Sequence, residues 1–422
     1  MFHHAPLRRL RAAVPLAAGL ALVLAACSQG SASVSESAAD DEATLVRYLN
    51  FSANDGHEED LDAIVAAFEE ENEDITVQVE TVPYADYFTK LQTDVAGGTV
   101  ADTFELNYEN FVTYAENGSL APLEDIDRDA YNESLLDAFS RDGAQYGVPT
   151  SFSNVVLFYN KDLFEEAGVD TPTNDWTWDD VRTAAEALTD QEAGVWGAYQ
   201  PVSFHEFYKT LAQAGGQFLT DDGSQVAFNS PEGVRAATWL VEKSGITMPT
   251  EADGAGTPDF DSDLFRDGKL AMWHTGIWMF GGMSDTEFEW DVVVEPGDAS
   301  RASALFTNGV GVSADSANPE AAQRWIDFLA ASDTTTQIRL DTSWELPPVA
   351  DESKLSAYLD VTPPANRQAV LDSLDSVVLP PVIERQQEMQ DVVTEELGSA
   401  AAGRKSAEEA LADAEERVNA LL

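Results

Sequence analysis

Polar side chains gather after two predicted strands near the beginning of the sequence. The strands predicted over residues 44–51 and 100–106 are followed by Asn54, Asp55, His57 and Glu58 and by Asn107 and Tyr108. Ligands of parallel sheets bind beyond the carboxyl ends of the strands. Carboxylate and amide groups at such a place can bind the hydroxyl groups of a ligand. Asp55, His57 and Glu58 have an alternative interpretation, because they also suit the cap of a helix that contains Leu61.

The sequence lacks the motifs of common catalytic and phosphate-binding sites. It has no Gly-x-Ser-x-Gly elbow, no His-Glu-x-x-His and no Gly-x-x-x-x-Gly-Lys. Paired carboxylates can hydrolyse a glycosidic bond. With 76 Asp and Glu residues, however, some pair always looks suitable, so the acids do not indicate an enzyme. We therefore predict that the protein is not an enzyme and has no cofactor.

Two acidic stretches resemble calcium-binding loops in their alternation. They are Asp-Phe-Asp-Ser-Asp at 259–263 and Asp-Ile-Asp-Arg-Asp at 125–129. Both lack the glycine that the sixth position of such a loop needs. We interpret them as solvated turns and predict no metal.

The net charge is the unusual feature of the composition. The 422 residues include 76 Asp and Glu against 23 Lys and Arg, giving −53. With 44% hydrophobic residues the chain can still bury a core of two or three domains. Such a surface repels nucleic acid and anionic lipid, so neither is a predicted partner. The excess of acidic residues indicates the solvated surface of a secreted protein or, as a sharper interpretation, adaptation to high external salt.

The N-terminus has the pattern of a secretory signal. Arg8, Arg9 and Arg11 precede an apolar stretch, residues 12–26, that is too short for a membrane span. It ends in Leu-Ala-Ala-Cys, which resembles the bacterial lipobox, so we predict a signal peptide over residues 1–26 and lipidation at Cys27. As the single cysteine, Cys27 excludes an intrachain disulfide. Residues 27–43 read as a flexible tether.

Strand and helix patterns alternate from residue 44 onward. Leu61, Ile64, Val65 and Phe68 share one helical face, and residues 75–79 alternate as a strand. A further helix and the strand at 100–106 complete a βαβαβ order, which predicts a parallel sheet. A second set of helical faces follows, at residues 181–188, 204–211 and 234–241. The fold class is therefore α/β.

The stretch of residues 147–168 connects the two sets. It runs from Gly-Val-Pro through a polar patch into the apolar run Val-Val-Leu-Phe-Tyr, then into a short helix at 161–167 that ends at Gly168. It resembles the hinge crossover of the extracellular solute-binding proteins of ABC importers, in the maltose-binding-like family. The segments Gly-Lys-Leu-Ala-Met (268–272) and Gly-Ile-Trp (276–278), a crossover at 307–312, a third crossing loop at 342–348 and a C-terminal segment at 401–411 also resemble that family.

This resemblance implies a two-lobed type II fold, each lobe a mainly parallel sheet flanked by helices, with the ligand cleft between the lobes. We expect lobe I to comprise residues 44–150 and 308–344, and lobe II residues 151–307 and 345–422. The implied function is capture of a sugar by hinge closure and delivery to the permease of an ABC importer. The implied protein is a monomer, anchored by lipid on the extracellular face of the membrane.

The resemblance also implies further ligand contacts. They are Ser151, Ser153, Phe204, His205, Glu206, Trp278, Asn308, Gly309, Trp344 and Glu345, beside Asn107 and Tyr108. An aromatic platform with carboxylates and amides suits the apolar faces and hydroxyl rim of a sugar. Core packing is the alternative for Trp278 and for Phe204, which also fits the apolar face of its own helix.

The sequence departs from the maltodextrin-binding members in one respect. Their late aromatic stackers correspond best to Met389, Gln390 and Asp391, which include no aromatic residue. This favours a smaller or differently shaped sugar. A polyol, a phosphorylated polyol or a polyamine remains an alternative solute, and a secreted glycoside-active enzyme or a lectin an alternative class. Phosphate would need Arg or Lys in the cleft, and the candidate loops contain none.

Overall fold

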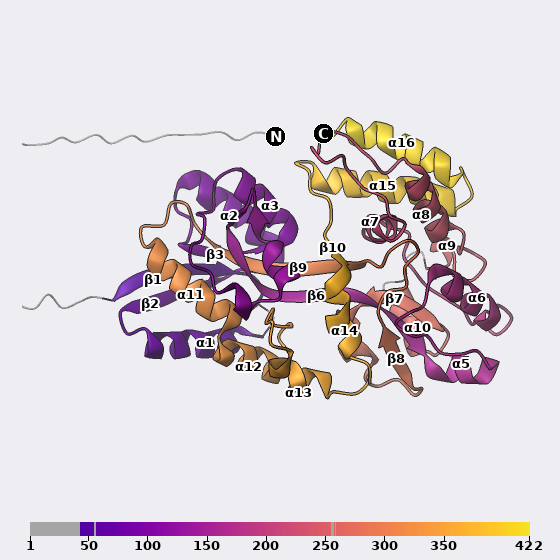
Figure 1. Ribbon diagram of the computed structural model, residues 1–422, viewed down its shortest axis with the longest axis horizontal. Coiled ribbons are helices and arrows are strands. Elements are labelled where there is room, and N and C mark those ends of the chain that lie inside the picture. The colour runs from indigo at the N-terminus through magenta and orange to yellow at the C-terminus, as the bar shows by residue number, and fades with distance from the viewer. Residues whose placement is uncertain (1–42, 55, 255–256, 258) are drawn as a thin grey trace, which may run out of the picture. The chain divides into compact units, whose positions relative to one another are not determined.

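The structure is a computed structural model that describes residues 43–54, 56–254, 257 and 259–422 (Figure 1). The predicted signal peptide, Cys27, nearly all of the tether and Asp55 lie outside the described residues. Among the described residues, no helix is long and apolar enough to cross a membrane.

The elements before the first crossover follow the predicted alternation. They are β1 (Thr44–Asn50), α1 (Glu58–Glu71), β2 (Ile75–Thr81), α2 (Tyr84–Gly97), β3 (Thr103–Asn107), α3 (Tyr108–Glu116), η1 (Arg128–Ala130), α4 (Glu133–Asp137), β4 (Ser140–Arg141), β5 (Ala144–Gln145) and β6 (Gly147–Asn160).

The elements up to the second crossover are mainly helical. They are α5 (Lys161–Ala167), α6 (Trp178–Leu188), α7 (Phe204–Gln213), α8 (Pro231–Val241), α9 (Glu251–Gly254), α10 (Phe260–Arg266), β7 (Met272–Gly276), η2 (Ile277–Met279), η3 (Gly281–Met283), β8 (Trp290–Val293) and β9 (Ser303–Val312).

The remaining elements complete the chain. They are α11 (Pro319–Ala331), α12 (Asp333–Thr342), η4 (Glu352–Leu355), α13 (Ser356–Leu359), α14 (Gln368–Asp372), η5 (Ser373–Ser376), β10 (Val377–Val378), α15 (Gln386–Ala401) and α16 (Ala407–Asn419). The C-terminal segment at 401–411 that resembles the family runs from the end of α15 into α16.

The strands form one sheet in the order β2-β1-β3-β9-β6-β7, with β10 beside β9 and β8 beside β6. β1 pairs in parallel with β2 and β3, as the βαβαβ pattern predicts. The pairs that β6 makes with β7, β8 and β9 are antiparallel, so the expectation of a mainly parallel sheet is wrong beyond the first set of elements. The reason is that β6 and β9 cross the molecule in opposite directions.

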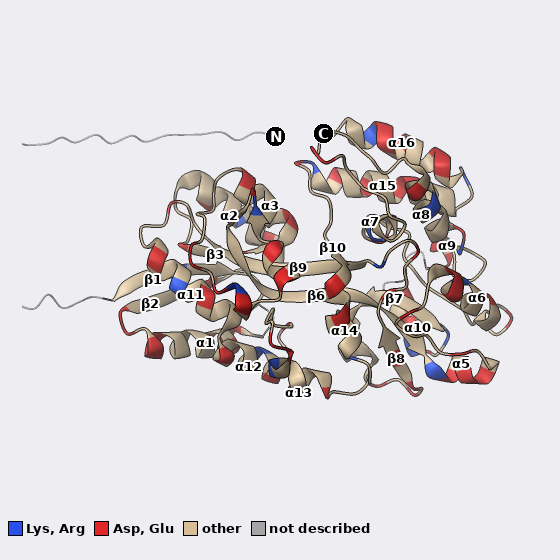
Figure 2. Ribbon diagram, in the orientation of Figure 1, with Lys and Arg blue, Asp and Glu red and all other residues tan. Residues whose placement is uncertain are grey.

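β6 is longer than the apolar run from which it was predicted. Its first half includes the polar patch, and it pairs with β9 from Gly147 to Asn154 with a register shift between Pro149 and Ser151. β6 and β9 therefore lie side by side across the middle of the described unit, and neither carries a charged side chain (Figures 1 and 2). Asp and Glu cover the helices on both sides of them (Figure 2).

The buried side chains divide into two groups on either side of this crossing. One group joins β1, β2 and β3 to α1, α2, α3 and α11, with Trp325 and Phe104 fully buried. We call this part the first lobe. The other joins β7 and β8 to α6, α7, α8, α15 and α16, with Trp239 and Trp273 nearly inaccessible, and we call it the second lobe. Burial of each such ring contributes about 1.5–3 kcal/mol to folding.

Local signals set several boundaries correctly. The Asn160 side chain accepts from the Leu163 amide at the start of α5, and Gly168 ends this helix with φ of 68°. At the start of α6, the Thr177 amide donates to Asp180, as the capping-box pattern predicts.

Candidate ligand-binding site

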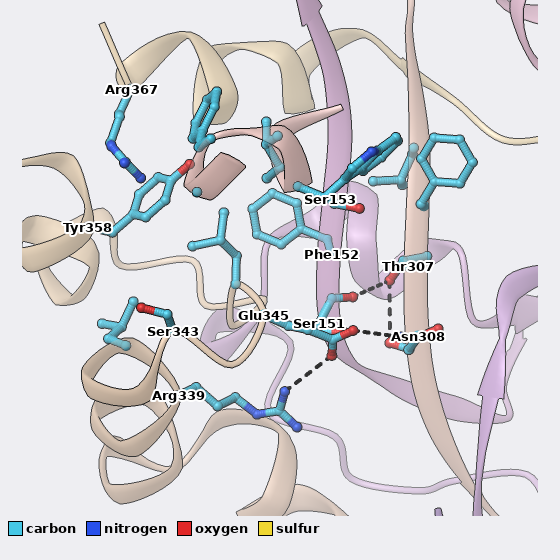
Figure 3. Close-up of a pocket in the computed structure, with 18 of the residues that line it drawn as sticks. Ser151, Phe152, Ser153, Thr307, Asn308, Arg339, Ser343, Glu345, Tyr358 and Arg367 are labelled. Atoms are coloured by element: carbon cyan, nitrogen blue, oxygen red, sulfur yellow. Dashed lines mark hydrogen bonds and ion pairs between the residues drawn. The ribbon is translucent and has the colours of Figure 1, made fainter. Parts of the chain in front are cut away.

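A cavity of about 950 Å³ opens between the two lobes. It lies beyond the carboxyl ends of β1 and β3 and along the middle of β6 and β9. Its other walls come from the first turn of α7, from η2 and η3, and from residues 339–367 (Figure 3). The cavity is thus built by segments that are far apart in the sequence and that belong to both lobes.

The floor of the cavity is polar. The Thr307 hydroxyl donates to the carbonyl of Ser151 at 2.8 Å, and the Asn308 amide donates to the carboxylate of Glu345 at 3.1 Å (Figure 3). The Ser151 hydroxyl is buried and has no hydrogen-bond partner among the described residues.

Arg339 lies beneath the loop that carries Glu345. Its Nη1 lies 3.5 Å from the Glu345 carboxylate, and its guanidinium group lies 4.3 Å from the centre of the Trp344 ring. Arg339 is only 1% exposed. Ser343 and Glu345 adopt left-handed backbone conformations, with φ of 59° and 51°. Such conformations cost about 1–3 kcal/mol each, so this loop is strained where it meets the cavity.

Trp278 presents a large apolar surface at the cavity. Its side chain is 55% exposed, and its ring meets Phe306 edge to face with centroids 5.4 Å apart. Gly276 makes this placement possible, because a Cβ there would lie about 2.0 Å from the Trp278 ring. The Gly-x-Trp pattern therefore lays the indole across the turn after β7. The segment after Gly276 is a single 3₁₀ turn, η2.

The first lobe supplies a second exposed ring at the cavity. Tyr84 is 55% exposed, and its hydroxyl accepts from the Asn107 amide at 3.2 Å. The pKa of Tyr84 is raised by partial burial and, to a smaller extent, by the charge of Glu109. The cavity therefore has an aromatic platform in each lobe.

His205 reaches the cavity from the first turn of α7. The Ser203 hydroxyl caps this turn by accepting from the Glu206 amide at 3.3 Å. The His205 ring packs against Phe306 with centroids 5.9 Å apart. Burial lowers the pKa of His205, although the charge of Glu109 opposes this shift. The imidazole is therefore neutral near pH 7 and can both donate and accept a hydrogen bond.

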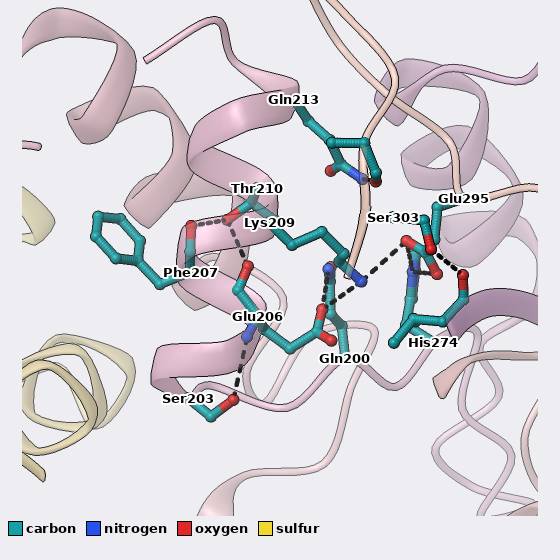
Figure 4. A network of polar contacts seen from close by, with 12 residues as sticks. Gln200, Ser203, Glu206, Phe207, Lys209, Thr210, Gln213, His274, Glu295 and Ser303 are labelled. Atoms are coloured by element: carbon teal, nitrogen blue, oxygen red, sulfur yellow. Dashed lines mark hydrogen bonds and ion pairs between the residues drawn. The ribbon is translucent and has the colours of Figure 1, made fainter. Parts of the chain in front are cut away.

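Glu206, the next residue, belongs to a buried network behind the cavity. Its carboxylate lies 2.7 Å from Lys209 Nζ, which also lies 3.0 Å from Glu295, and His274 Nδ1 lies 3.1 Å from both Glu295 oxygens (Figure 4). Gln200 donates to Glu206 at 2.7 Å. Glu206 is 6% exposed and is not among the residues that line the cavity, because Lys209 holds its carboxylate in the interior.

Other predicted contacts also lie elsewhere. Phe204 packs in the core of the second lobe at 1% exposure. A Cβ on Gly309 would meet the ring of Phe139 at 2.4 Å, so this glycine faces the core of the first lobe. Trp344 is buried by stacking on His57, with centroids 5.2 Å apart, and its indole donates to the Ser52 carbonyl.

The remaining predicted residues around α1 do not line the cavity. His57 lies 2.8 Å from Asp60, and Glu58 is exposed at the first turn of α1, where it accepts from the Gly56 amide. Both residues lie at the start of α1, but the N-cap residue His57 makes no side-chain capping hydrogen bond. Asn54 lies outside the lining, and Asp55 outside the described residues. The predicted residues that the cavity brings together are Asn107, Tyr108, Ser151, Ser153, His205, Trp278, Asn308 and Glu345.

Sequence reasoning missed several lining residues, among them Tyr84, Arg339, Tyr358 and Arg367. The two arginines bring basic groups to the cavity from outside the candidate loops, which contain none. Glu109 directly follows Asn107 and Tyr108 at the same strand end, and it also lines the cavity. Among the described residues, no group of three or more His, Cys, Asp or Glu side chains could hold a metal ion.

The molecule has two lobes connected by three chain segments, namely β6, β9 and residues 343–346, and a cavity for a solute lies between the lobes. This arrangement defines a two-lobed binding protein. The chain belongs to the family of bacterial extracellular solute-binding proteins, whose model matches residues 54–336. This family binds solutes and does not catalyse reactions.

Solved structures and curated relatives agree with this family. An ABC substrate-binding protein from Listeria monocytogenes, solved in complex with cycloalternan, is 45% identical over 90% of this chain and 99% of its own, with a TM-score of 0.76. A cyclic alpha-maltosyl-1,6-maltose binding protein from Arthrobacter globiformis is 26% identical over 90% and 99%, with a TM-score of 0.75. A maltooligosaccharide ABC transporter solute-binding lipoprotein from Streptococcus pneumoniae is 25% identical over 93% and 92%.

Proposed function

We propose that this protein captures a neutral oligosaccharide outside the cell and delivers it to the permease of an ABC importer. The observation that carries this proposal is the exposed Trp278 ring at the edge of a cavity whose floor is formed by hydroxyl, amide and carboxylate groups. An indole covers the apolar face of a sugar ring, while such polar groups bind its hydroxyls.

The charges around the cavity favour a neutral solute. Glu109 and Glu345 line it together with Arg339 and Arg367, so the charges of the four side chains balance, in a protein of net charge −53. Arg339 lies against Glu345, and Arg367 donates to two backbone carbonyls. A phosphate ester would require uncommitted basic groups, and a polyamine would require uncompensated carboxylates.

The size of the cavity favours several sugar rings over one. Its volume of about 950 Å³ is at the upper end of the range for small-molecule sites. Trp278 and Tyr84 offer separate platforms in the two lobes. The ligands named for the Listeria and Arthrobacter proteins are cyclic oligosaccharides, so we propose a compact or cyclic α-glucan as the first ligand to test.

The lobes that close on this ligand are proposed as residues 44–150 with 308–344 and residues 151–307 with 345–422. The membership of the buried cores supports these bounds, except that Leu135 packs with the second lobe and the partly buried Leu379 and Val382 pack against the first. Three segments cross between the lobes, namely β6, β9 and residues 343–346. A ligand that touches both lobes would shift an open–closed equilibrium toward the closed state by its higher affinity for that state.

The remaining parts of the proposal follow the sequence patterns. Residues 1–26 act as a signal peptide, and Cys27 is lipidated and holds the protein on the extracellular face of the membrane. The protein acts as a monomer, transfers its ligand unchanged and uses no cofactor. Masses of membrane-extracted protein and of a Cys27→Ala variant would test the anchor directly.

The experiment that tests the function is ligand titration of the chain lacking residues 1–27. Maltose, maltotriose, maltotetraose and cycloalternan are added while tryptophan fluorescence and thermal unfolding are recorded. A ligand at ~100 times its Kd should stabilise the protein by about 2.7 kcal/mol. Recovery of the sugar intact separates a binding protein from an enzyme. Absence of a response to every neutral sugar would overturn the sugar assignment.

The first variant to test is Trp278→Ala. Loss of a half-exposed platform should weaken binding by about 2 kcal/mol, close to thirtyfold, while the stability of the unliganded protein changes little. Titration calorimetry and urea unfolding measure the two effects. Trp239→Phe, in the core of the second lobe, serves as the opposite control, since it should lower stability and leave affinity unchanged.

A further inference from the structure

Arg367 holds one wall of the cavity in place. Its Nε donates to the Val361 carbonyl at 2.8 Å, and its Nη2 donates to the Pro363 carbonyl at 3.3 Å. The guanidinium group also lies 4.7 Å from the centre of the Tyr358 ring. Tyr358, Val361 and Pro363 all line the cavity, and Val361 is 48% exposed (Figure 3).

The other side of the same guanidinium group is fixed to the second lobe. It lies 4.9 Å from the centre of the Phe280 ring. Phe280 is 6% exposed and packs against Phe158 and Trp290, with centroids 5.3 and 5.9 Å apart. The position of Phe280 is therefore set by the core and does not depend on Arg367. Arg367 consequently links a fixed ring to a wall that is more exposed.

The backbone that carries Arg367 is anchored to the sheet. The Asn366 amide donates to the side chain of Asp291 at 2.8 Å, and its side chain donates to the Val292 carbonyl at 2.9 Å, both on β8. Asn154 on β6 donates to the Val370 carbonyl at 2.8 Å. Arg367 thus projects from a point that two strands hold.

By contrast, the wall itself relies on local bonds. The Asp360 amide donates to the Ser356 carbonyl, and the Val361 amide donates to that of Tyr358. These bonds shape the turn but do not tie it to the sheet, and within the wall Tyr358 and Leu359 are the residues that pack against the core of the second lobe. Burial lowers the pKa of Arg367 and raises that of Tyr358 to about 12, which reflects how closely the two groups are enclosed.

We propose that Arg367 is a positioning residue that fixes the wall of residues 358–363 and thereby sets the preference of the cavity for larger oligosaccharides. This inference rests on the proposed sugar-binding function. On this proposal a short sugar occupies the region of Trp278, Asn308 and Glu345 without reaching the wall. A larger sugar does, and its affinity depends on the wall being held. Lysine cannot replace Arg367, because a single ammonium group cannot stack between two rings while donating along two directions.

The test compares Arg367→Met, Arg367→Lys and the wild-type protein with maltose and with the largest sugar that the wild type binds. We expect Arg367→Met to lower the affinity for the larger sugar about tenfold and the affinity for maltose less than about twofold. Arg367→Lys should recover little of the affinity for the larger sugar that Arg367→Met loses. Arg301→Met is the matched control, since Arg301 makes an exposed ion pair with Asp175 outside the cavity, and neither affinity should change.

A second measurement needs no ligand. Amide hydrogen exchange of Arg367→Met should be faster at residues 357–362 and unchanged at residues 205–213. Unchanged exchange at the wall, or an equal loss of affinity for both sugars, would overturn the role of Arg367 while leaving the binding function intact. A wild-type protein that binds no sugar would overturn the proposed function instead, and the exchange experiment would still decide whether Arg367 holds the wall.

Discussion

Glu105 in the first lobe and Glu295 in the second are equally inaccessible carboxylates whose pKa values shift in opposite directions. Burial raises the pKa of Glu105 to about 7, and the charge of Glu345 adds to this shift. Burial also acts to raise the pKa of Glu295, but the charges of Lys209 and His274 lower it to about 2. The partners of a buried carboxylate, and not its exposure, therefore decide its charge.

The surroundings of the two carboxylates also differ in how completely they are satisfied. One oxygen of Glu105 accepts from the amides of Phe51 and Ser52, while the other has no partner among the described residues. Both oxygens of Glu295 lie within 3.1 Å of His274, and one also meets Lys209. Phe51 lines the cavity, so Glu105 supports a wall of the site, whereas Glu295 supports the core behind it.

The largest effect is expected from Glu295→Gln. This change leaves Lys209 and His274 without their shared carboxylate, and breaking a buried ion pair costs about 3–5 kcal/mol. Urea unfolding at pH 7 measures the loss. The affinity of the folded protein for sugar should be unchanged, since the network lies behind the cavity. A loss below about 1 kcal/mol would show that the network does not stabilise the second lobe.

The next effect is a pH dependence that comes from Glu105. Between pH 4.5, the ordinary pKa of the group, and about pH 7, the unfolded chain releases a proton that the folded protein keeps. The stability contributed by Glu105 therefore falls as pH rises through this window, by on the order of 3 kcal/mol, and stays lost above it.

Glu105→Gln isolates this contribution. Subtracting the variant's profile of unfolding free energy against pH from that of the wild type cancels the contributions of all other acids. The difference should change across pH 4.5–7 and be flat above pH 7. Asp327→Asn is the matched comparison. Burial raises the pKa of Asp327 to about 6, so the difference between the wild type and Asp327→Asn should change at lower pH. A flat difference for Glu105→Gln from pH 4 to 8 would contradict the raised pKa. Glu295, whose pKa is lowered, loses its contribution only as pH falls toward 2.

The contrast between these carboxylates also explains how far the sequence could predict the site. Trp278 was found because Gly276 and Trp278 are two residues apart, so the signal is local. The end of α5 at Gly168 was predicted for the same reason. Glu206 was misplaced, although Lys209 three residues later on α7 indicated a possible pair. The i to i+3 spacing could not show that Glu295 and His274 would complete a buried network.

The missed residues depend on where the chain returns to the cavity. Arg339, Tyr358 and Arg367 lie on elements that reach it only after the second crossover, and no nearby motif marks them. The same limit applies to the direction of β6 and β9. An apolar run predicted β6 and the family resemblance predicted a crossover at β9, but the antiparallel pairing depends on contacts between residues more than 140 positions apart. The parallel set of β1, β2 and β3 follows from short connections and was predicted correctly.

A smaller effect, on binding, is expected from Glu345→Gln. The amide side chain keeps an acceptor for Asn308 but loses the charge that faces Arg339. Charge-assisted hydrogen bonds to a ligand are about twice as strong as neutral ones, so affinity should fall by about 1–2 kcal/mol, close to tenfold. Calorimetry measures this loss. Glu58→Gln is the control, because Glu58 is exposed and outside the cavity, and an equal loss in both variants would show that surface charge and not the site is responsible.

The smallest effect concerns the strained loop beside Glu345. Ser343→Gly should stabilise the unliganded protein by about 0.5–1 kcal/mol, because glycine adopts the φ of 59° at this position without steric cost. Asp142→Gly is the matched variant, since Asp142 has a φ of 51° in the turn between β4 and β5, outside the cavity. Both variants should gain stability in urea unfolding, Asp142→Gly less so because aspartate tolerates this conformation better.

Only Ser343→Gly should also lower the affinity for the sugar, by up to about threefold, because a more flexible loop must be ordered when the ligand binds. If both variants left affinity unchanged, the strain of residues 343–345 would be a consequence of the crossing between the lobes and not part of the binding site. If Ser343→Gly lost stability instead, the Ser343 side chain would contribute contacts at the cavity edge that outweigh the strain of its backbone.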